Sequence, residues 1–198
     1  MTSLMRTHRT GARWSTLAGA ASFGLIFVVA NVSGAQAAPA GDSAAPPAAP
    51  ADVRSITAVI HAAYDVISGP AGPRDWNRFY SLFAPGARLI RTLRDSSGAT
   101  HLQPMTPHEF AALAGKYFKT NPFFEREIGR ESNTFGAVTQ AFSAYDSKRA
   151  PSDAKPFARG INSFQLFNDG KRWYIVTIYW DDERSGETIP DRYLHTAP

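Results

Sequence analysis

Apolar residues recur at helical spacing near the start of the folded part of this 198-residue chain. Between Asp52 and Ser68 they stand three and four positions apart, which predicts an amphipathic helix with Asp52 as its N-cap. A Gly- and Pro-rich stretch, residues 69–73, ends this helix. A second, short helix is expected to follow, with Trp76 on its apolar side, until Pro85-Gly86 stops it.

From Ala87 onward the pattern changes to a period of two, which is typical of strands. The segments 87–95 and 100–105 predict a hairpin or a strand with an irregular return. Thr106 and Glu109 then form a capping-box pattern that opens a helix to about Thr120. The last third is rich in aromatic and β-branched residues, and we expect four long strands, at residues 123–131, 135–147, 159–167 and 172–183.

The turn between the last two strands predicts their register. Asp169-Gly170 supplies the two positive-φ positions of a type I′ turn, which sets Leu166 opposite Trp173 and Phe164 opposite Ile175. On this register both faces of the sheet are apolar, so we expect a second copy of the chain to cover the outer face. The expected homodimer surface consists of Tyr174, Val176, Ile178 and Trp180.

The N-terminal region has the pattern of a secretory signal peptide. Residues 1–37 contain three arginines and no acid, followed by an apolar stretch at 17–30 and by Ala35-Gln36-Ala37. Fourteen apolar residues span only about 21 Å, so stable membrane insertion is not expected. We therefore expect cleavage before Ala38, export to the periplasm or the medium, an Ala/Pro-rich linker at 38–51 and one domain at 52–198.

Charge and cysteine content narrow the function further. Beyond the leader the chain carries 18 basic and 17 acidic residues, so it lacks the basic excess of nucleic-acid binders. It has no cysteine, which leaves stability to a hydrophobic core and excludes thiolate metal sites. His101 and His108 fall on different elements without a third ligand, so neither a metal nor a cofactor is expected.

Three segments resemble the nuclear transport factor 2-like superfamily, including its SnoaL-like and ketosteroid-isomerase-like bacterial members. WNRFYSLFAPGARLI is similar to the second helix and first strand of that family, and RGINSFQLFNDGKRWYIVTIYWDDE to its closing hairpin. FGAVTQAFSAYDSKR resembles the strand before that hairpin. The resemblance implies an α+β cone, in which N-terminal helices pack on a curved antiparallel β-sheet around a pocket.

The implied pocket supplies the candidate site residues. In some enzymes of the family a Tyr of the first helix donates a hydrogen bond, a role that would fall to Tyr64 here, although a core position is the simpler interpretation. A base would have to be a carboxylate, and among Glu125, Glu127, Asp146, Asp181 and Asp182 the first choice is Asp181, followed by Glu125. The residues expected to contact a ligand are Tyr64, Trp76, Asn162, Trp173, Thr177 and Tyr179.

Three functions stay open at this point. The first is an exported protein that binds a small apolar or aromatic molecule in the cone. The second is a cofactor-free isomerase, dehydratase or cyclase that uses a pocket carboxylate as its base. The third is a structural or protein-interaction module whose cone is filled by aromatic side chains. The chain has no GxSxG, P-loop, GxGxxG or HExxH motif, which argues against other enzyme classes.

Overall fold

The computed structural model describes residues 46–184 and 186–195. The predicted leader, 1–37, and most of the predicted linker lie outside these residues, so export and cleavage before Ala38 stay predictions. The linker prediction needs one correction, because its last two residues belong to a short helix, α1 (Pro50–Val53), with Pro50 in its first turn. None of the helices in the part of the chain that the structure describes has both the length and the apolar character needed to cross a membrane.

The predicted first long helix is α2 (Ile56–Ile67), and it begins later than expected. Its N-cap is Ser55, whose hydroxyl accepts a hydrogen bond from the backbone N–H of Ala58, and not Asp52. Asp52 instead pairs with the guanidinium of Arg78, with 2.8 Å between Oδ2 and Nε. Asp52 therefore ties α1 to the following helix, α3 (Trp76–Ser81), in place of capping α2.

The capping box predicted at Thr106 and Glu109 is present. The hydroxyl of Thr106 accepts from the backbone N–H of Glu109, and the Glu109 carboxylate accepts from the backbone N–H of Thr106. This box opens α4 (Pro107–Phe118), which ends two residues before the predicted boundary.

Six strands form one open sheet in the order β2-β1-β6-β5-β4-β3. Adjacent strands run antiparallel, except β1 and β6, which run parallel to each other. The expectation of a purely antiparallel sheet is therefore corrected to a mixed one. β1 begins earlier than predicted and runs through Pro85-Gly86, where its pairing with β6 shifts register. The strands are β1 (Phe83–Arg94), β2 (Thr100–Met105), β3 (Phe124–Phe135), β4 (Val138–Lys148), β5 (Ala158–Asn168) and β6 (Trp173–Asp182).

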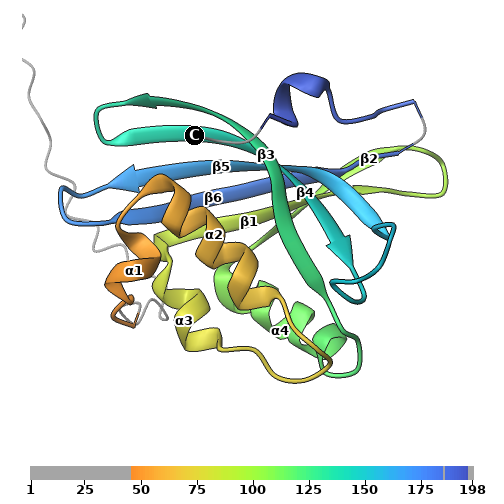
Figure 1. Cartoon of the computed structure of the whole chain (residues 1–198), viewed down its shortest axis with the longest axis horizontal. Helices are drawn as coiled ribbons and strands as arrows, with labels where there is room; N and C mark the ends of the chain where they lie inside the picture. The colour runs from red at the N-terminus through yellow and green to blue at the C-terminus, as the bar shows by residue number, and fades with distance from the viewer. Residues whose placement is uncertain (1–45, 185, 196–198) are drawn as a thin grey trace, which may run out of the picture. The chain divides into compact units, whose positions relative to one another are not determined.

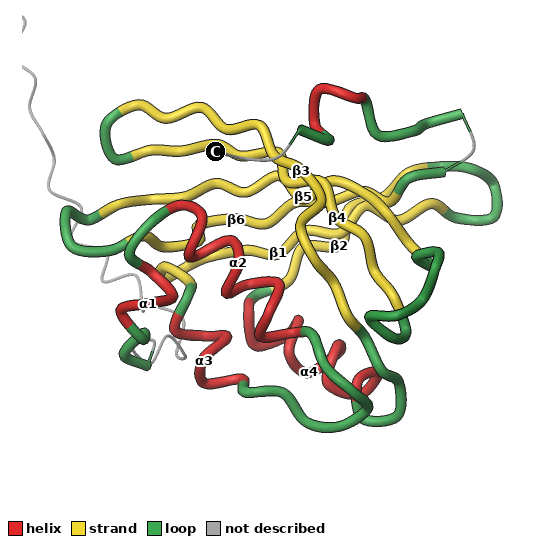
Figure 2. The backbone as a smooth tube through the Cα atoms, viewed as in Figure 1, coloured by secondary structure: helices red, strands yellow, loops and turns green. Residues whose placement is uncertain are grey.

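The helices gather on one face of the curved sheet, as Figures 1 and 2 show. The hydrophobic core lies between the two layers, where the side chains of Ile60, Phe79 and Phe164 are almost completely buried. Beside this core, all six strands contribute side chains to the concave face of the sheet, from Met105 on β2 to Glu125 on β3. The site lies on this face.

The predicted register of the last hairpin is wrong. The loop is longer than a two-residue type I′ turn, because the Asp169 carboxylate accepts from the backbone N–H groups of Lys171 and Arg172. Asn168 consequently pairs with Trp173, and Leu166 pairs with Ile175. A bulge between Gln165 and Leu166 then shifts β6 by one more residue, which exchanges the faces of its second half.

The bulge changes which β6 residues face the helices. Phe164 pairs with Ile178, and Asn162 with Trp180, so these β6 residues lie on the concave face. The predicted dimer surface therefore loses Ile178 and Trp180 and keeps Tyr174 and Val176. The homodimer itself stays a prediction.

The C-terminal segment covers part of the outer sheet face that a second copy was expected to cover. It contains a short 3-10 helix, η1 (Asp191–Tyr193), and the ring of Tyr193 lies 5.4 Å from that of Phe142 between centroids. The backbone N–H of Arg130 donates to the carbonyl oxygen of His195 over 3.1 Å. The C-terminal segment of the same chain thus packs on part of the outer face of the sheet.

Candidate functional site

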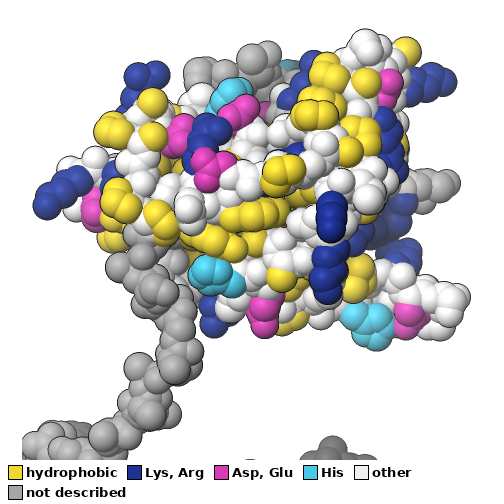
Figure 3. Space-filling view, turned by 90° about the horizontal axis from the view of Figure 1, so that it is seen from below, with side chains coloured by type: hydrophobic (Ala, Val, Ile, Leu, Met, Phe, Trp, Pro, Cys, Tyr) yellow, Lys and Arg dark blue, Asp and Glu magenta, His cyan; other side chains and the backbone are white. Residues whose placement is uncertain are grey.

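A cavity of about 520 Å³ lies between the helices and the concave face of the sheet. Its wall is mostly apolar, and it opens to solvent beside three exposed residues of α4 and the β4–β5 connection, Leu113, Tyr117 and Phe157. Figure 3 shows hydrophobic side chains gathered across the middle of one face of the molecule, with Lys and Arg side chains beside them as well as at the edges. The apolar wall includes Phe79, Leu89, Phe110, Phe164, Ile178 and Trp180.

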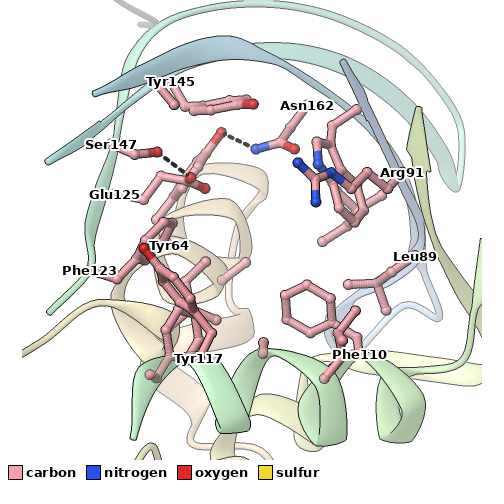
Figure 4. A pocket seen from close by; sticks show the side chains of 18 of the residues that line it. Tyr64, Leu89, Arg91, Phe110, Tyr117, Phe123, Glu125, Tyr145, Ser147 and Asn162 are labelled. Atoms are coloured by element: carbon pink, nitrogen blue, oxygen red, sulfur yellow. Dashed lines mark hydrogen bonds between the residues drawn. The ribbon is translucent and has the colours of Figure 1, made fainter. Parts of the chain in front are cut away.

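Polar side chains interrupt the apolar wall on the sheet side. Figure 4 shows Glu125, Tyr64 and Ser147 close together on one side and Arg91 on the other, with Asn162 between them. They come from α2, β1, β3, β4 and β5, and the sheet curvature brings them to one cavity. A mostly apolar cavity with a few convergent polar groups is the usual form of a small-molecule site.

Glu125 is the acidic centre of this group. Its Oε2 accepts a hydrogen bond of 2.7 Å from the Ser147 hydroxyl on β4. Burial raises the pKa of the Glu125 carboxyl from 4.5 to about 7, the Ser147 hydrogen bond opposes that rise, and the charge of Asp182 adds to it. Glu125 therefore exchanges a proton near neutral pH, where most carboxyl groups are fully ionised.

A chain of hydrogen bonds fixes the hydroxyl of Tyr64. The amide of Asn162 donates to this hydroxyl over 3.1 Å, and Ser143 donates its own proton to Glu127 over 2.6 Å. The 2.7 Å contact between Tyr64 and Ser143 must then be a donation by Tyr64. Burial, with the charge of Glu125, also raises the pKa of Tyr64 above its ordinary 10. Tyr64 thus presents an acceptor to the cavity, and its proton is already bound.

A second polar cluster joins three strands across Gly160. The Tyr145 hydroxyl on β4 donates to Asp182 Oδ1 on β6 over 2.6 Å, although β5 lies between the two strands. Gly160 on β5 pairs with both residues, and a Cβ there would lie 2.5 Å from the Tyr145 hydroxyl oxygen. The missing side chain lets Tyr145 lie over β5, and burial raises the pKa of Tyr145.

Neither a family model nor a curated protein sequence matches this chain. Solved structures with a similar arrangement include a protein of unknown function with a cystatin-like fold from Nostoc punctiforme, 10% identical, at a TM-score of 0.48, covering 66% of this chain and 95% of that one. Another is an NTF-2-like protein of unknown function from Silicibacter pomeroyi, which is 13% identical at a TM-score of 0.45. That match covers 66% of this chain and 94% of the other. Helices packed on one face of an open, mixed six-stranded sheet agree with the nuclear transport factor 2-like cone that the sequence resemblance implies.

These likenesses concern the fold alone. A candidate ketosteroid isomerase from Shewanella frigidimarina is also similar, 12% identical at a TM-score of 0.35, covering 54% of this chain and 81% of that one. At such values its description says nothing about the activity of this chain, which has to be argued from its own cavity.

The structure brings some of the predicted site residues to the cavity and not others. Tyr64, Asn162 and Glu125 line it. Trp76 packs inside the helix layer against Phe79, with 5.5 Å between ring centroids, and does not line it. Trp173, Thr177 and Tyr179 are absent from the wall, because the β6 bulge turns Thr177 and Tyr179 outward.

Asp181, the first choice of base, is also outside the cavity. Its carboxylate pairs with the guanidinium of Arg184, with 2.7 Å between Oδ2 and Nη2, and this hydrogen bond lowers the pKa of Asp181. Asp182 takes its place on the wall, because the bulge puts even-numbered residues of β6 inward from Ile178 on. No group of three or more possible metal ligands occurs among residues 46–184 and 186–195.

Sequence reasoning did not find Arg91, Tyr145 or Ser147. Arg91 and Ser147 lie in strands where polar and apolar positions alternate, as many solvent-exposed residues do. No local sequence pattern distinguishes these two residues from exposed ones. Gly160 is the one signal that was available, since a glycine inside a β-rich run marks a close approach of another group. That signal would have pointed to its neighbours on β4 and β6 and so to Tyr145.

Replacing Glu125 should change the pH dependence of stability. The folded-state pKa of about 7 lies above the unfolded value of 4.5, so the folded chain holds a proton that the unfolded chain has lost between these values. The stabilisation of the folded chain by this retained proton is complete below pH 4.5 and disappears as the pH rises through 7. At pH 8 we expect Glu125→Gln to raise the free energy of unfolding by about 2 kcal/mol, after allowance for screening by cavity water.

Urea unfolding at pH 4.5 and pH 8 measures this effect. The gain should be large at pH 8 and small at pH 4.5, and the exposed Glu131→Gln should show no such difference. An equal effect of Glu125→Gln at both pH values would contradict a buried carboxyl that titrates near neutrality.

Proposed function

We propose that this protein binds a small apolar or aromatic molecule in the cavity between its helices and its sheet. The observation that carries this proposal is a cavity of about 520 Å³ with an apolar wall and a polar group around Glu125. That volume is within the range of small-molecule sites, and a cone filled by aromatic side chains would have left no such space. Ligand binding is therefore better supported than a purely structural module.

A second function is favoured by one further observation, the proton affinity of Glu125. A carboxylate with a pKa of about 7 on an apolar wall is suited to general base catalysis at neutral pH. The reaction would break a C–H bond beside a ligand carbonyl. The proton would pass to the Glu125 carboxylate, and the electron pair would form an enolate. In a ketone with a C=C bond one carbon further from the carbonyl, the enolate would extend over that bond. Return of the proton to the far carbon of the former C=C bond would then complete an isomerisation with no other reactant.

The role expected for Tyr64 changes in this proposal. As a hydrogen-bond donor to a developing oxyanion it would need a free proton, and that proton is donated to Ser143. Tyr64 instead holds Asn162 in place through the bond it accepts from the amide. The Asn162 amide also hydrogen-bonds the Glu125 carboxylate and lowers its pKa, so Asn162 joins Tyr64 to this acidic group.

Binding of 2-acetylnaphthalene tests the proposal, because it has an aromatic body and one carbonyl group. We expect isothermal titration calorimetry to show one molecule bound per chain. An indole on the cavity wall should block the site, so Ala114→Trp should weaken binding at least about tenfold. Ala112→Trp, on the exposed side of the same helix, is the matched control and should bind as the unchanged chain does.

The same titration can reject the proposal. If the titration gives no heat of binding up to the solubility limit of 2-acetylnaphthalene, the result would count against an aromatic ligand site. Equal affinity of the Ala114 and Ala112 variants would place the bound molecule elsewhere on the protein.

A further inference from the structure

Arg91 on β1 is the one cationic side chain on the cavity wall among the described residues, and its hydrogen-bonding capacity is largely unused. Figure 4 shows its guanidinium directed into the cavity, from the wall opposite Glu125. Its hydrogen-bond partner is Asp182, at 3.5 Å between Nη2 and Oδ2, and the side chain is 45% exposed. A guanidinium has five N–H donors, so most of the donors of Arg91 have no protein acceptor.

Asp182 is held in place by a second contact. Its Oδ1 accepts the Tyr145 hydroxyl at 2.6 Å, while Oδ2 faces Arg91. The carboxylate therefore stays beside Arg91 and offsets much of its positive charge. Glu125 adds a further negative charge to the cavity whenever it is ionised.

These charges favour a neutral oxygen over a full anion as the partner of Arg91. A ligand carboxylate would gain the attraction of Arg91 but would also be repelled by Asp182 and by ionised Glu125. A ligand ammonium group would place a second cation beside Arg91. A carbonyl oxygen accepts strong hydrogen bonds from the free N–H donors without adding net charge.

We propose that Arg91 binds the carbonyl oxygen of an aromatic or alicyclic ketone held in the cavity. The inference rests on the proposed ligand-binding function and adds the chemical class of the ligand. It also assigns the oxygen contact to Arg91, since Tyr64 has no proton to donate. If Glu125 removes a neighbouring proton, negative charge develops on the oxygen that faces Arg91, where the guanidinium stabilises it.

A pair of isosteric ligands isolates this contact. In 2-isopropenylnaphthalene a C=CH2 group replaces the C=O group of 2-acetylnaphthalene, so the two differ in the acceptor oxygen and little in shape. The quantity measured is the ratio of their affinities in each variant, which cancels the packing of the naphthyl ring. Arg91→Leu should reduce the preference for the ketone at least about tenfold, because a hydrogen bond to a charged donor is lost.

Matched variants make the result specific. Arg88 lies on the same strand but outside the cavity wall, and it donates to the backbone carbonyl oxygens of Gly86 and Ala87. The variant Arg88→Leu should therefore leave the affinity ratio unchanged. Arg91→Lys keeps the charge without the planar fork and should give an intermediate ratio. If Arg91→Leu binds neither ligand because it is unfolded, Arg91→Gln serves for the same ratio.

The outcomes separate the two proposals. Binding of both ligands with a ratio that Arg91→Leu leaves unchanged would overturn the role of Arg91 and leave the cavity as a ligand site. Failure of the unchanged chain to bind either ligand would reject the ligand site, and the role of Arg91 with it. A ratio that falls equally in Arg88→Leu would trace the effect to net charge and would also overturn the direct contact.

Discussion

Glu125→Gln is expected to slow the exchange of the methyl protons of 2-acetylnaphthalene for deuterium by about 100- to 1,000-fold, compared with the unchanged chain. General base catalysis by a positioned side chain contributes this order of rate. Glutamine keeps the shape of the side chain and can still accept the Ser147 hydrogen bond, so the loss would come from the missing base. Proton NMR in deuterium oxide measures the exchange directly.

The pH dependence of the exchange provides a second readout. Only ionised Glu125 is a base, so the rate should rise as the pH increases through about 7 and fall away below it. Ser147 donates to the charged carboxylate and lowers its pKa, so Ser147→Ala should move the profile to higher pH. Exchange no faster with the unchanged chain than in buffer would reject the proton-transfer function and leave binding alone.

Gly160→Ala is expected to lower the free energy of unfolding by about 2 to 3 kcal/mol, as overpacking of a filled interior does. A Cβ at this position would lie 2.3 Å from the carbonyl oxygen of Asp181 and 2.5 Å from the Tyr145 hydroxyl oxygen. The carbonyl oxygen of Asp181 belongs to the backbone of the paired strand β6, so it cannot move without loss of hydrogen bonds between β5 and β6. The Tyr145 ring would have to leave its position over β5.

Gly115→Ala is the matched control. A Cβ there meets the Trp76 ring at 3.4 Å, and alanine favours the helix, so the change in the free energy of unfolding should stay within about 1 kcal/mol. Urea unfolding of both variants measures the difference. Equal stability of Gly160→Ala and the unchanged chain would mean that Tyr145 and Asp182 do not need the glycine between them.

Elements with local signals could be predicted from the sequence. The capping box at Thr106 depends on residues three positions apart, and it formed as the sequence predicts. The apolar periodicity of α2 likewise placed Tyr64 against the sheet. Only the cap of α2 was misplaced, because the long-range pair between Asp52 and Arg78 competes with a local cap.

The face assignment of β6 could not be predicted, and most errors in the site follow from it. Asp-Gly indicates a tight turn, but the Asp169 carboxylate holds a longer loop through two backbone N–H groups. The bulge beside Gln165 then moves Thr177 outward and Asp182 inward. A bulge is set by packing against neighbouring strands and leaves no period in the sequence.

The measurement that tests the central claim most directly is the location of bound 2-acetylnaphthalene by nuclear Overhauser contacts in the unchanged chain. We expect contacts from the naphthyl protons to Phe110, Phe164 and Trp180 on the cavity wall, and none to Thr177 or Tyr179 on the outer face. Contacts confined to Tyr179 and its outer-face neighbours would contradict a ligand site between the helices and the sheet.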